Sequence, residues 1–235
     1  MIPVVSEKNI KNSSIDQKNR PVEEAYDAIK NMLYYKELAP GQRLVYGDLA
    51  KKLHMSLTPV IQALNKLEST ELVYYEPHKG YFVGKITEKE VAEIYQTREA
   101  LEVAIVPAIM KNIREKDLIY IKESIAEYEK TFTEVESRRL NMLKNMQYHL
   151  KIAEYSHQTV ILKVLRNLLE RLALKSGPNY LGDERIKNAI KEHRRIFKAF
   201  MTKDSNEAIA AIRAHNRSSL EHVIGGLNKT VPISF

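Results

Sequence analysis

The 235-residue chain contains no cysteine, which removes several classes of function. Without thiols there is no disulfide framework, no thiolate metal site and no cysteine nucleophile. No apolar run approaches the roughly 18 residues that cross a bilayer. Residues 1–20 lack the order of basic, apolar and small residues that marks a signal peptide. We therefore expect a soluble, cytoplasmic protein without a membrane partner.

Short catalytic motifs are also missing. The sequence contains no HExxH, no GxSxG and no Gly-rich phosphate loop, so we predict that the protein is not an enzyme. What is present suits a folded protein, because 44% hydrophobic and 29% charged residues are enough to form a buried core. The net charge of +7 favours polyanionic partners such as nucleic acid.

The residue pattern divides the chain into two structured regions. Residues 1–20 are polar and predict a mobile tail, whereas residues 21–86 combine short helices with two β-rich runs around a turn. From residue 87 onward the periodicity is helical only. It begins with a capping box at 87–90, where Thr87 bonds the first-turn amides and Glu90 reaches back, and the first helix is expected to kink near Pro107.

We therefore predict a mainly α fold: a small α/β domain over 21–86, an all-helical bundle over 87–228 and a tail over 229–235. Helices are predicted from apolar periodicity and turn signals at 22–38, 47–54, 58–70, 115–132, 137–156, 158–175, 183–203 and 205–227.

The first domain has the element order of a winged helix-turn-helix. Two short helices, at 47–54 and 58–70, are separated by a turn and followed at once by the predicted hairpin. The second helix has the size to enter the major groove of DNA, with the hairpin beside it over the phosphates. The alternative that order alone leaves open is a small α/β domain whose hairpin has no such role.

The stretch PGQRLVYGDLAKKLHMSLTPVIQALNKLESTELVYYEPHKGYFV resembles the DNA-binding domain of GntR-family transcriptional regulators. The elements PGQRL, LAKKL, TPV, AL-x-x-LE and KGYFV occur in the family's order and at its spacing. The resemblance implies that the protein binds double-stranded operator DNA. The candidate contacts lie on the second helix and the hairpin: Ser56, Thr58, Gln62, Asn65, Lys66, His78, Lys79 and Gly80.

Three positions depart from that family's pattern. The family usually carries arginine where this chain has Leu57 and Ile61, and often where it has Gly47. Arginine is the side chain that most often recognises guanine, through two hydrogen bonds, whereas leucine and isoleucine can only touch thymine methyl groups. The departures predict weak guanine recognition and a preference for A·T-rich sites. The alternative is a degenerate DNA-binding surface.

Three histidines lie on the apolar stripes of three different predicted helices: His149, His193 and His215. A single histidine in such a place is usually a core residue with its own hydrogen-bond partner. Three on separate helices favour convergence on one site, because each buried imidazole would otherwise need a separate partner. Imidazoles combined with an oxygen ligand suit Zn, Ni, Fe or Mn. His222 is a weaker reserve ligand.

The bundle also resembles, over residues 88–225, the FCD-type effector domain of FadR-like GntR regulators. The stretches YQTREALE, NMQYH, KEHRRIFKAFMTKD and AAIRAH carry the resemblance. In that family an aspartate and three histidines hold a divalent metal beside a small organic acid. The resemblance implies the metal ligands Asn145, His149, His193 and His215, and an effector site formed by Arg98 together with these four residues.

Asn145 stands where the family has aspartate. A neutral amide oxygen is the weaker ligand, and it leaves the metal group one unit more positive, which favours an anionic effector. The planar guanidinium of Arg98 suits a carboxylate, and its alternative role is a salt bridge to Glu102. We predict a homodimeric, effector-responsive transcription regulator. The alternatives are a metal-dependent enzyme with a three-histidine site and an architectural DNA binder that needs no ligand.

Overall fold

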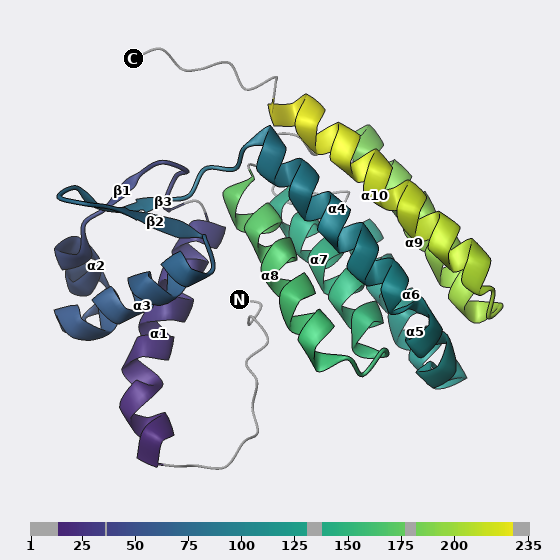
Figure 1. Ribbon diagram of the computed structural model, residues 1–235, viewed down its shortest axis with the longest axis horizontal. Coiled ribbons are helices and arrows are strands. Elements are labelled where there is room, and N and C mark those ends of the chain that lie inside the picture. Colours follow the sequence, from purple (N-terminus) through teal and green to yellow (C-terminus); the bar gives the residue numbers. More distant parts are fainter. Residues whose placement is uncertain (1–13, 36, 131–137, 177–181, 228–235) are drawn as a thin grey trace. The chain divides into compact units, whose positions relative to one another are not determined.

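The computed structural model describes residues 14–35, 37–130, 138–176 and 182–227. The chain forms two compact units, residues 1–84 and 85–235 (Figure 1). Helices dominate both units, and the strands belong to the N-terminal one, as predicted. Among the described residues, no helix is long and apolar enough to cross a membrane.

The N-terminal unit combines three helices with a small antiparallel sheet. Its elements are α1 (Ser14–Tyr34), β1 (Arg43–Leu44), α2 (Tyr46–Leu53), α3 (Leu57–Ser69), β2 (Val73–Glu76) and β3 (Gly80–Val83). The strand order is β1-β3-β2, and α3 packs against both α1 and α2 (Figure 1). This arrangement confirms the predicted winged helix-turn-helix.

α3 forms where the apolar spacing predicted it. Val60, Ala63, Leu64 and Leu67 recur every three or four residues, and their side chains are fully buried. Pro59 lies in the first turn, where a missing backbone N–H breaks no helical hydrogen bond. The opposite face of the helix is left for solvent or a partner.

α1 begins earlier than the sequence predicted. Residues 14–20, expected to belong to a tail, are helical, and residues 1–13 lie outside the described ranges. Arg20 supports this part of α1 through an ion pair with Glu24 at 3.0 Å, one helical turn away. Pro21 lies inside the helix without ending it. The residue pattern did not reveal this part of α1, because the sequence SIDQKNR has no apolar stripe at helical spacing.

The C-terminal unit is entirely helical within the described ranges. Its elements are α4 (Glu88–Ala104), α5 (Val106–Asn112), α6 (Glu115–Lys130), α7 (Arg138–Glu154), α8 (Thr159–Lys175), α9 (Asp183–Met201) and α10 (Ser205–Leu227). α10 packs against both α4 and α9, and α7 packs against α6 and α8. The predicted helical bundle is confirmed.

The predicted kink near Pro107 is instead a break between two helices. α4 ends at Ala104, α5 starts at Val106, and Pro107 is the second residue of α5. In one continuous helix the proline ring would collide with the carbonyl group four residues earlier. At the start of a new helix the same proline costs no hydrogen bond.

The capping box at the start of α4 forms only in part. The Thr87 hydroxyl accepts the backbone N–H of Glu90 at 3.1 Å, as predicted. The Glu90 carboxylate does not return to Thr87: its Oε1 lies 2.6 Å from Lys175 and 2.7 Å from Arg171 of α8. Two cationic partners attract a carboxylate more strongly than one backbone N–H. Glu90 therefore joins the first turn of α4 to the end of α8.

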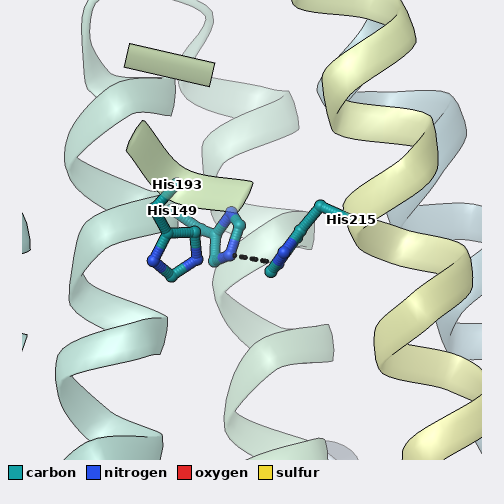
Figure 2. Close-up of side chains that lie close together, drawn as sticks. All are labelled: His149, His193 and His215. Atoms are coloured by element: carbon teal, nitrogen blue, oxygen red, sulfur yellow. Dashed lines mark hydrogen bonds between the residues drawn. The ribbon is translucent and has the colours of Figure 1, made fainter. Parts of the chain in front are cut away.

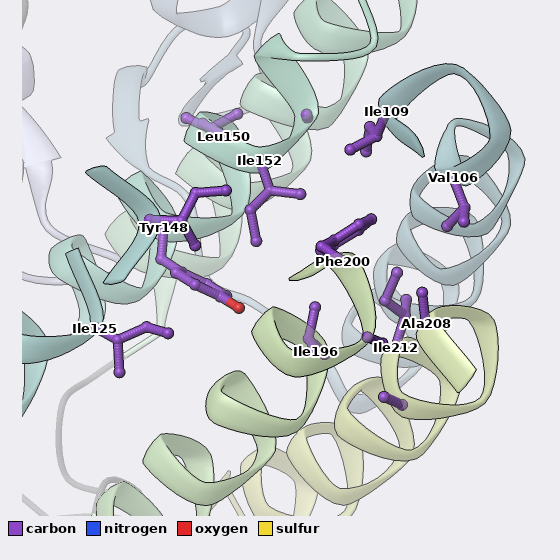
Figure 3. Close-up of a cluster of buried hydrophobic side chains, with 14 of the residues drawn as sticks. Val106, Ile109, Ile125, Tyr148, Leu150, Ile152, Ile196, Phe200, Ala208 and Ile212 are labelled. Carbon is purple, nitrogen blue, oxygen red and sulfur yellow. The ribbon is translucent and has the colours of Figure 1, made fainter. Parts of the chain in front are cut away.

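One large apolar cluster fixes the relative positions of these helices. It contains isoleucines from α5, α6, α7, α9 and α10, and Phe200, which is fully buried, lies among Ile109, Ile152, Ile196 and Ile212 (Figure 3). Branched and aromatic side chains have few rotamers to lose and fill such a core densely. The polar side chains that α7, α9 and α10 place beside this core are held equally firmly.

Candidate functional site

Three helices of the C-terminal unit bring three histidines together. His149 comes from α7, His193 from α9 and His215 from α10, and all three are buried (Figure 2). Each ring offers one nitrogen, and these three atoms lie within 4.8 Å of one another. The convergence predicted from three separate apolar stripes is therefore present.

Two carboxylates orient two of the three imidazoles. Nδ1 of His149 lies 3.0 Å from Oε1 of Glu102, and Nδ1 of His215 lies 2.7 Å from Oε2 of Glu192. A carboxylate accepts hydrogen bonds, so we assign the proton of each neutral ring to Nδ1 and the lone pair to Nε2. The two Nε2 atoms face each other across 3.1 Å. Two lone pairs at this distance repel unless a cation or proton lies between them.

Burial keeps the imidazoles neutral. It lowers the pKa of His193 well below the ordinary value and lowers that of His215 as well. Burial, assisted by the Arg98 guanidinium, lowers the pKa of His149 to about 3, although Glu102 acts in the opposite direction. At neutral pH the cluster therefore offers three uncharged imidazoles, the form that binds metals.

The two carboxylates stay ionised despite their burial. Burial opposes the charge on Glu102, but Arg98 and His149 outweigh it and hold its pKa well below the ordinary value. The same balance lowers the pKa of Glu192 to about 2, where hydrogen bonds from His215 and Arg185 prevail over burial. Each carboxylate is thus a charged acceptor for an imidazole N–H.

His193 is the least satisfied of the three histidines. Neither of its ring nitrogens has a hydrogen-bond partner among the residues that the structure describes. Its ring stacks on Tyr148 with 4.0 Å between centroids, and the Tyr148 hydroxyl donates to the His193 carbonyl at 3.0 Å. A buried polar group without a partner costs about 1–3 kcal/mol. This cost is offset if the ring binds something that is not part of the chain.

The donor set fits a divalent cation. Two nitrogens bound to one ion at about 2.0–2.1 Å lie about 2.8–3.4 Å apart for octahedral to tetrahedral angles, and the Nε2 atoms of His149 and His215 lie 3.1 Å apart. Both rings also donate their other N–H to a carboxylate, the usual support of metal-binding histidines. The residues present therefore suit Zn, Ni, Fe or Mn.

A cavity of ≈ 60 Å³ lies in the same unit, lined by the predicted effector contacts Arg98 and Asn145. Ser219, Arg185 and the rings of Tyr95 and Tyr128 add polar groups, and leucine, methionine, alanine and valine side chains complete the wall. The exposed reserve ligand His222 also lines it. The three clustered histidines, predicted to bind both the metal and the effector, are not part of this lining, whereas Asn145, the fourth predicted metal ligand, is.

Arg98 connects the cavity to the histidine cluster. Its side chain is 1% exposed, and its Nε donates to Oε1 of Glu102 at 3.1 Å, so the alternative salt bridge is present. The same Glu102 oxygen accepts from His149. Nη2 of Arg98 has no hydrogen-bond partner in the described ranges. The guanidinium thus keeps one buried donor for a further acceptor.

The groups that support the histidines were not predicted from the sequence. Glu192 precedes His193, but neighbouring helical side chains point about 100° apart, and Glu192 turns to His215 of the next helix. Arg185 holds Glu192 through two hydrogen bonds of 2.9 and 2.8 Å. The seven-residue spacing of Arg185 and Glu192 is the signal that could have revealed them, because it puts both on one helix face.

The exposed face of α3 carries several of the predicted DNA contacts. Ser56, Thr58 and Gln62 are exposed. Asn65 is exposed as well, but its side-chain oxygen accepts from the Tyr81 hydroxyl, and half-buried Lys66 pairs with Glu23 of α1. The Lys66 ammonium also lies 4.3 Å from the centre of the Tyr26 ring. Lys66 therefore leans toward α1.

The other predicted contacts form the tip of the hairpin. His78 and Gly80 have positive φ angles of 64° and 94°, which produce the tight turn between β2 and β3. Lys79 pairs with Glu76 at 2.6 Å, but its side chain is 65% exposed, and such a surface pair is weak. Lys79 can therefore exchange this partner for a phosphate.

Packing does not dictate the absence of arginine at the three departing positions. Leu57 is 47% exposed and Ile61 is half-buried. A Cβ atom added at Gly47 would meet nothing within 4 Å. The space around Gly47 and the exposure of Leu57 therefore give no packing reason for the observed residues at these two positions.

Two family models match the chain: the bacterial regulatory proteins of the gntR family at residues 21–83 and the FCD domain at residues 93–218. The chain is 27% identical over 198 residues to the HTH-type transcriptional regulator YdhC of Bacillus subtilis, covering 84% of this chain and 88% of that protein. It is 25% identical over 198 residues to the HTH-type transcriptional regulator McbR of Escherichia coli, covering 83% and 84%.

Solved structures show the same fold. The E. coli McbR/YncC structure has a TM-score of 0.77 at 20% identity and covers 88% of this chain and 99% of that chain. A GntR regulator from Rhodococcus sp. RHA1 has a TM-score of 0.75 at 18% identity, covering 88% and 98%. Regulators of this kind bind DNA and are not enzymes. The chain therefore belongs to the GntR family of transcription regulators and carries an FCD domain.

Proposed function

We propose that this DNA-binding regulator responds to a small carboxylate bound in its helical domain beside a divalent metal. His149, His193 and His215 would hold the metal, with the amide oxygen of Asn145 as a further ligand. Arg98 would bind the carboxylate. When bound, the metal supplies a fixed positive centre for one carboxylate oxygen. The proposal rests on one observation: three neutral imidazoles meet at one place, and the Nε2 atoms of His149 and His215, each with a lone pair, lie 3.1 Å apart.

The charge balance of the site favours an anionic ligand. Buried Arg98 and Arg185 are matched by the carboxylates of Glu102 and Glu192, and the three imidazoles are neutral. A divalent ion therefore adds two positive charges that no described neighbour in the cluster offsets. Burying uncompensated charge is costly, so an anion stabilises the loaded site.

The position of Arg98 supports a carboxylate as that anion. Its unpaired Nη2 is buried, and the guanidinium lines a cavity whose wall mixes polar and apolar side chains. A planar guanidinium binds a carboxylate with directed, charge-assisted hydrogen bonds. The cavity volume of ≈ 60 Å³ suits a small acid. Neighbouring polar groups such as Asn145 and Ser219 would orient it.

We also propose that the regulator acts as a homodimer on a two-fold operator. A symmetric dimer places two winged domains on half-sites along one face of the DNA. Effector binding would change operator affinity through the relative placement of these domains, and the coupling between the two sites must be reciprocal. An architectural DNA binder would instead show steep salt dependence and no response to a ligand.

Metal analysis of the purified full chain tests the proposal. We expect about one divalent ion per chain, and a lower melting temperature after treatment with a chelator, because a bound ion stabilises the folded state. His193→Ala should lose the metal. His157→Asn is the matched control, because His157 is exposed and has a φ of 56° that asparagine tolerates. A metal-free protein whose melting temperature the chelator leaves unchanged would refute the metal site.

The effector is tested separately with a series of short mono- and dicarboxylates. Binding to the metal-loaded chain should raise its melting temperature, and Arg98→Lys should weaken the effect, because lysine lacks the planar fork. If a carboxylate raises the melting temperature of Arg98→Lys as much as that of the unchanged chain, Arg98 does not bind the carboxylate.

A further inference from the structure

Two apolar side chains occupy the exposed face of α3 one helical turn apart. Leu57 is 47% exposed and Ile61 is half-buried. A single exposed apolar residue on a protein needs no explanation. Here two such residues follow one row of the helix that a winged helix-turn-helix inserts into the major groove. They lie where the protein meets DNA bases.

The polar side chains farther along α3 are already engaged. Asn65 accepts a hydrogen bond from Tyr81 of the hairpin, and Lys66 pairs with Glu23 of α1. Both are therefore partly occupied by contacts within the unit, although Asn65 is exposed and the Lys66–Glu23 pair lies at the surface. α3 has no arginine, and recognition of guanine depends chiefly on arginine or lysine. Thr58 and Gln62 remain exposed beside the apolar pair.

We propose that Leu57 and Ile61 recognise the C5-methyl groups of thymines in the major groove and thereby determine operator specificity. The inference rests on the assignment of the N-terminal unit as a DNA-binding domain. The thymine methyl is the apolar group among the base edges of the major groove, so it is the feature that aliphatic side chains can distinguish. Gln62 would contact an adenine next to them through its amide.

The spacing of the pair defines the pattern of bases. Side chains four residues apart on a helix have Cβ atoms about 5–6 Å apart, and stacked base pairs are about 3.4 Å apart. Leu57 and Ile61 therefore reach methyl groups one or two base steps apart. Each half-site should contain two T·A pairs within three consecutive positions.

Phosphate contacts supply affinity but cannot replace this recognition. Arg43, Lys51 and Lys79 of the same unit are exposed and can bind the DNA backbone. Such contacts orient the domain without distinguishing sequences. Discrimination between operators then falls on the apolar pair and Gln62.

Replacement of thymine by deoxyuridine tests the proposal directly, because it removes the methyl group and leaves base pairing intact. Binding sites are first selected from random DNA with the full chain, and each thymine is then replaced singly at constant salt. Loss of one methyl contact, equivalent to about 0.8 kcal/mol for one buried CH₂, should weaken binding about fourfold. Two of the thymines in each half-site should show this effect.

Variants assign the two methyl groups to the two side chains. Leu57→Ala and Ile61→Ala should each make the protein insensitive to deoxyuridine at one position, and both should fold, since neither side chain is fully buried. Val160→Ala is the matched control: it truncates a side chain of α8 that is 77% exposed and should keep full sensitivity. Ile61→Arg should shift the preferred base toward guanine.

Three results would overturn the proposal. The first is a selected consensus with guanines and no thymines under α3. The second is unchanged affinity after deoxyuridine replacement at every thymine. The third, enrichment of no sequence at all, would also remove the assignment of the unit as a specific DNA-binding domain, which the first two leave intact.

Discussion

Glu90 provides a quantitative test of how the helical domain is held together. Its carboxylate is 17% exposed and bonds Lys175, which is only 7% exposed, and Arg171, which is 15% exposed. Glu90→Gln removes the negative charge but keeps the backbone N–H that Thr87 caps. Two nearly buried cations then lose the charge of Glu90. Breaking a fully buried pair costs about 3–5 kcal/mol.

Partial exposure and the remaining glutamine oxygen reduce this cost to about 2–4 kcal/mol. For a domain of this size, that corresponds to a decrease of roughly 4–16 °C in melting temperature. Thermal unfolding of the full chain, followed by far-UV circular dichroism, measures it. Glu93→Gln is the matched control on the same helix, because its pair with Lys89 is long, at 3.9 Å, and exposed. It should change the melting temperature by no more than a degree or two.

The destabilisation caused by Glu90→Gln must also depend on pH in a defined direction. Burial opposes the ionisation of Glu90, but hydrogen bonds from Lys175 and Arg171 outweigh it and lower the pKa in the folded protein. The stabilisation is therefore complete above the unfolded pKa of roughly 4.3 and is lost as the pH falls through the folded pKa. The difference between wild type and Glu90→Gln should narrow in acid. Equal losses in Glu90→Gln and Glu93→Gln, or a pH-independent difference, would refute the reasoning.

Two further predictions concern the histidine cluster. Tyr148→Phe removes the hydroxyl that donates to the His193 carbonyl at 3.0 Å and should destabilise the chain by about 0.5–1.5 kcal/mol in urea unfolding; a larger loss would mean that the ring packing also changes. Asn145→Asp replaces the proposed neutral oxygen ligand with a charged one and should tighten metal binding on the order of tenfold in competition with a chelator. Unchanged affinity would argue that residue 145 is not a ligand.

Local patterns in the sequence determined the elements and much of the site. The spacing of apolar residues predicted α3 and the helices of the C-terminal unit to within a few residues. It also placed His149, His193 and His215 on buried faces, because a helix of 3.6 residues per turn fixes which side chains share a face. Those faces must turn toward one another to leave water, but the packing of the helices decided that the three histidines meet at the same level.

Only the tertiary structure decided which groups pair. Glu192 hydrogen-bonds His215 rather than its neighbour His193. Glu90 pairs with Lys175 of α8 instead of completing its capping box, and Lys66 pairs with Glu23 of α1. Each choice joins residues between 23 and 85 positions apart in the chain. A polar side chain takes the strongest partner within reach, and the partners within reach are set by how the helices pack. The periodicity of the sequence determines which face of a helix a residue occupies. It does not determine which residue of a neighbouring helix lies opposite.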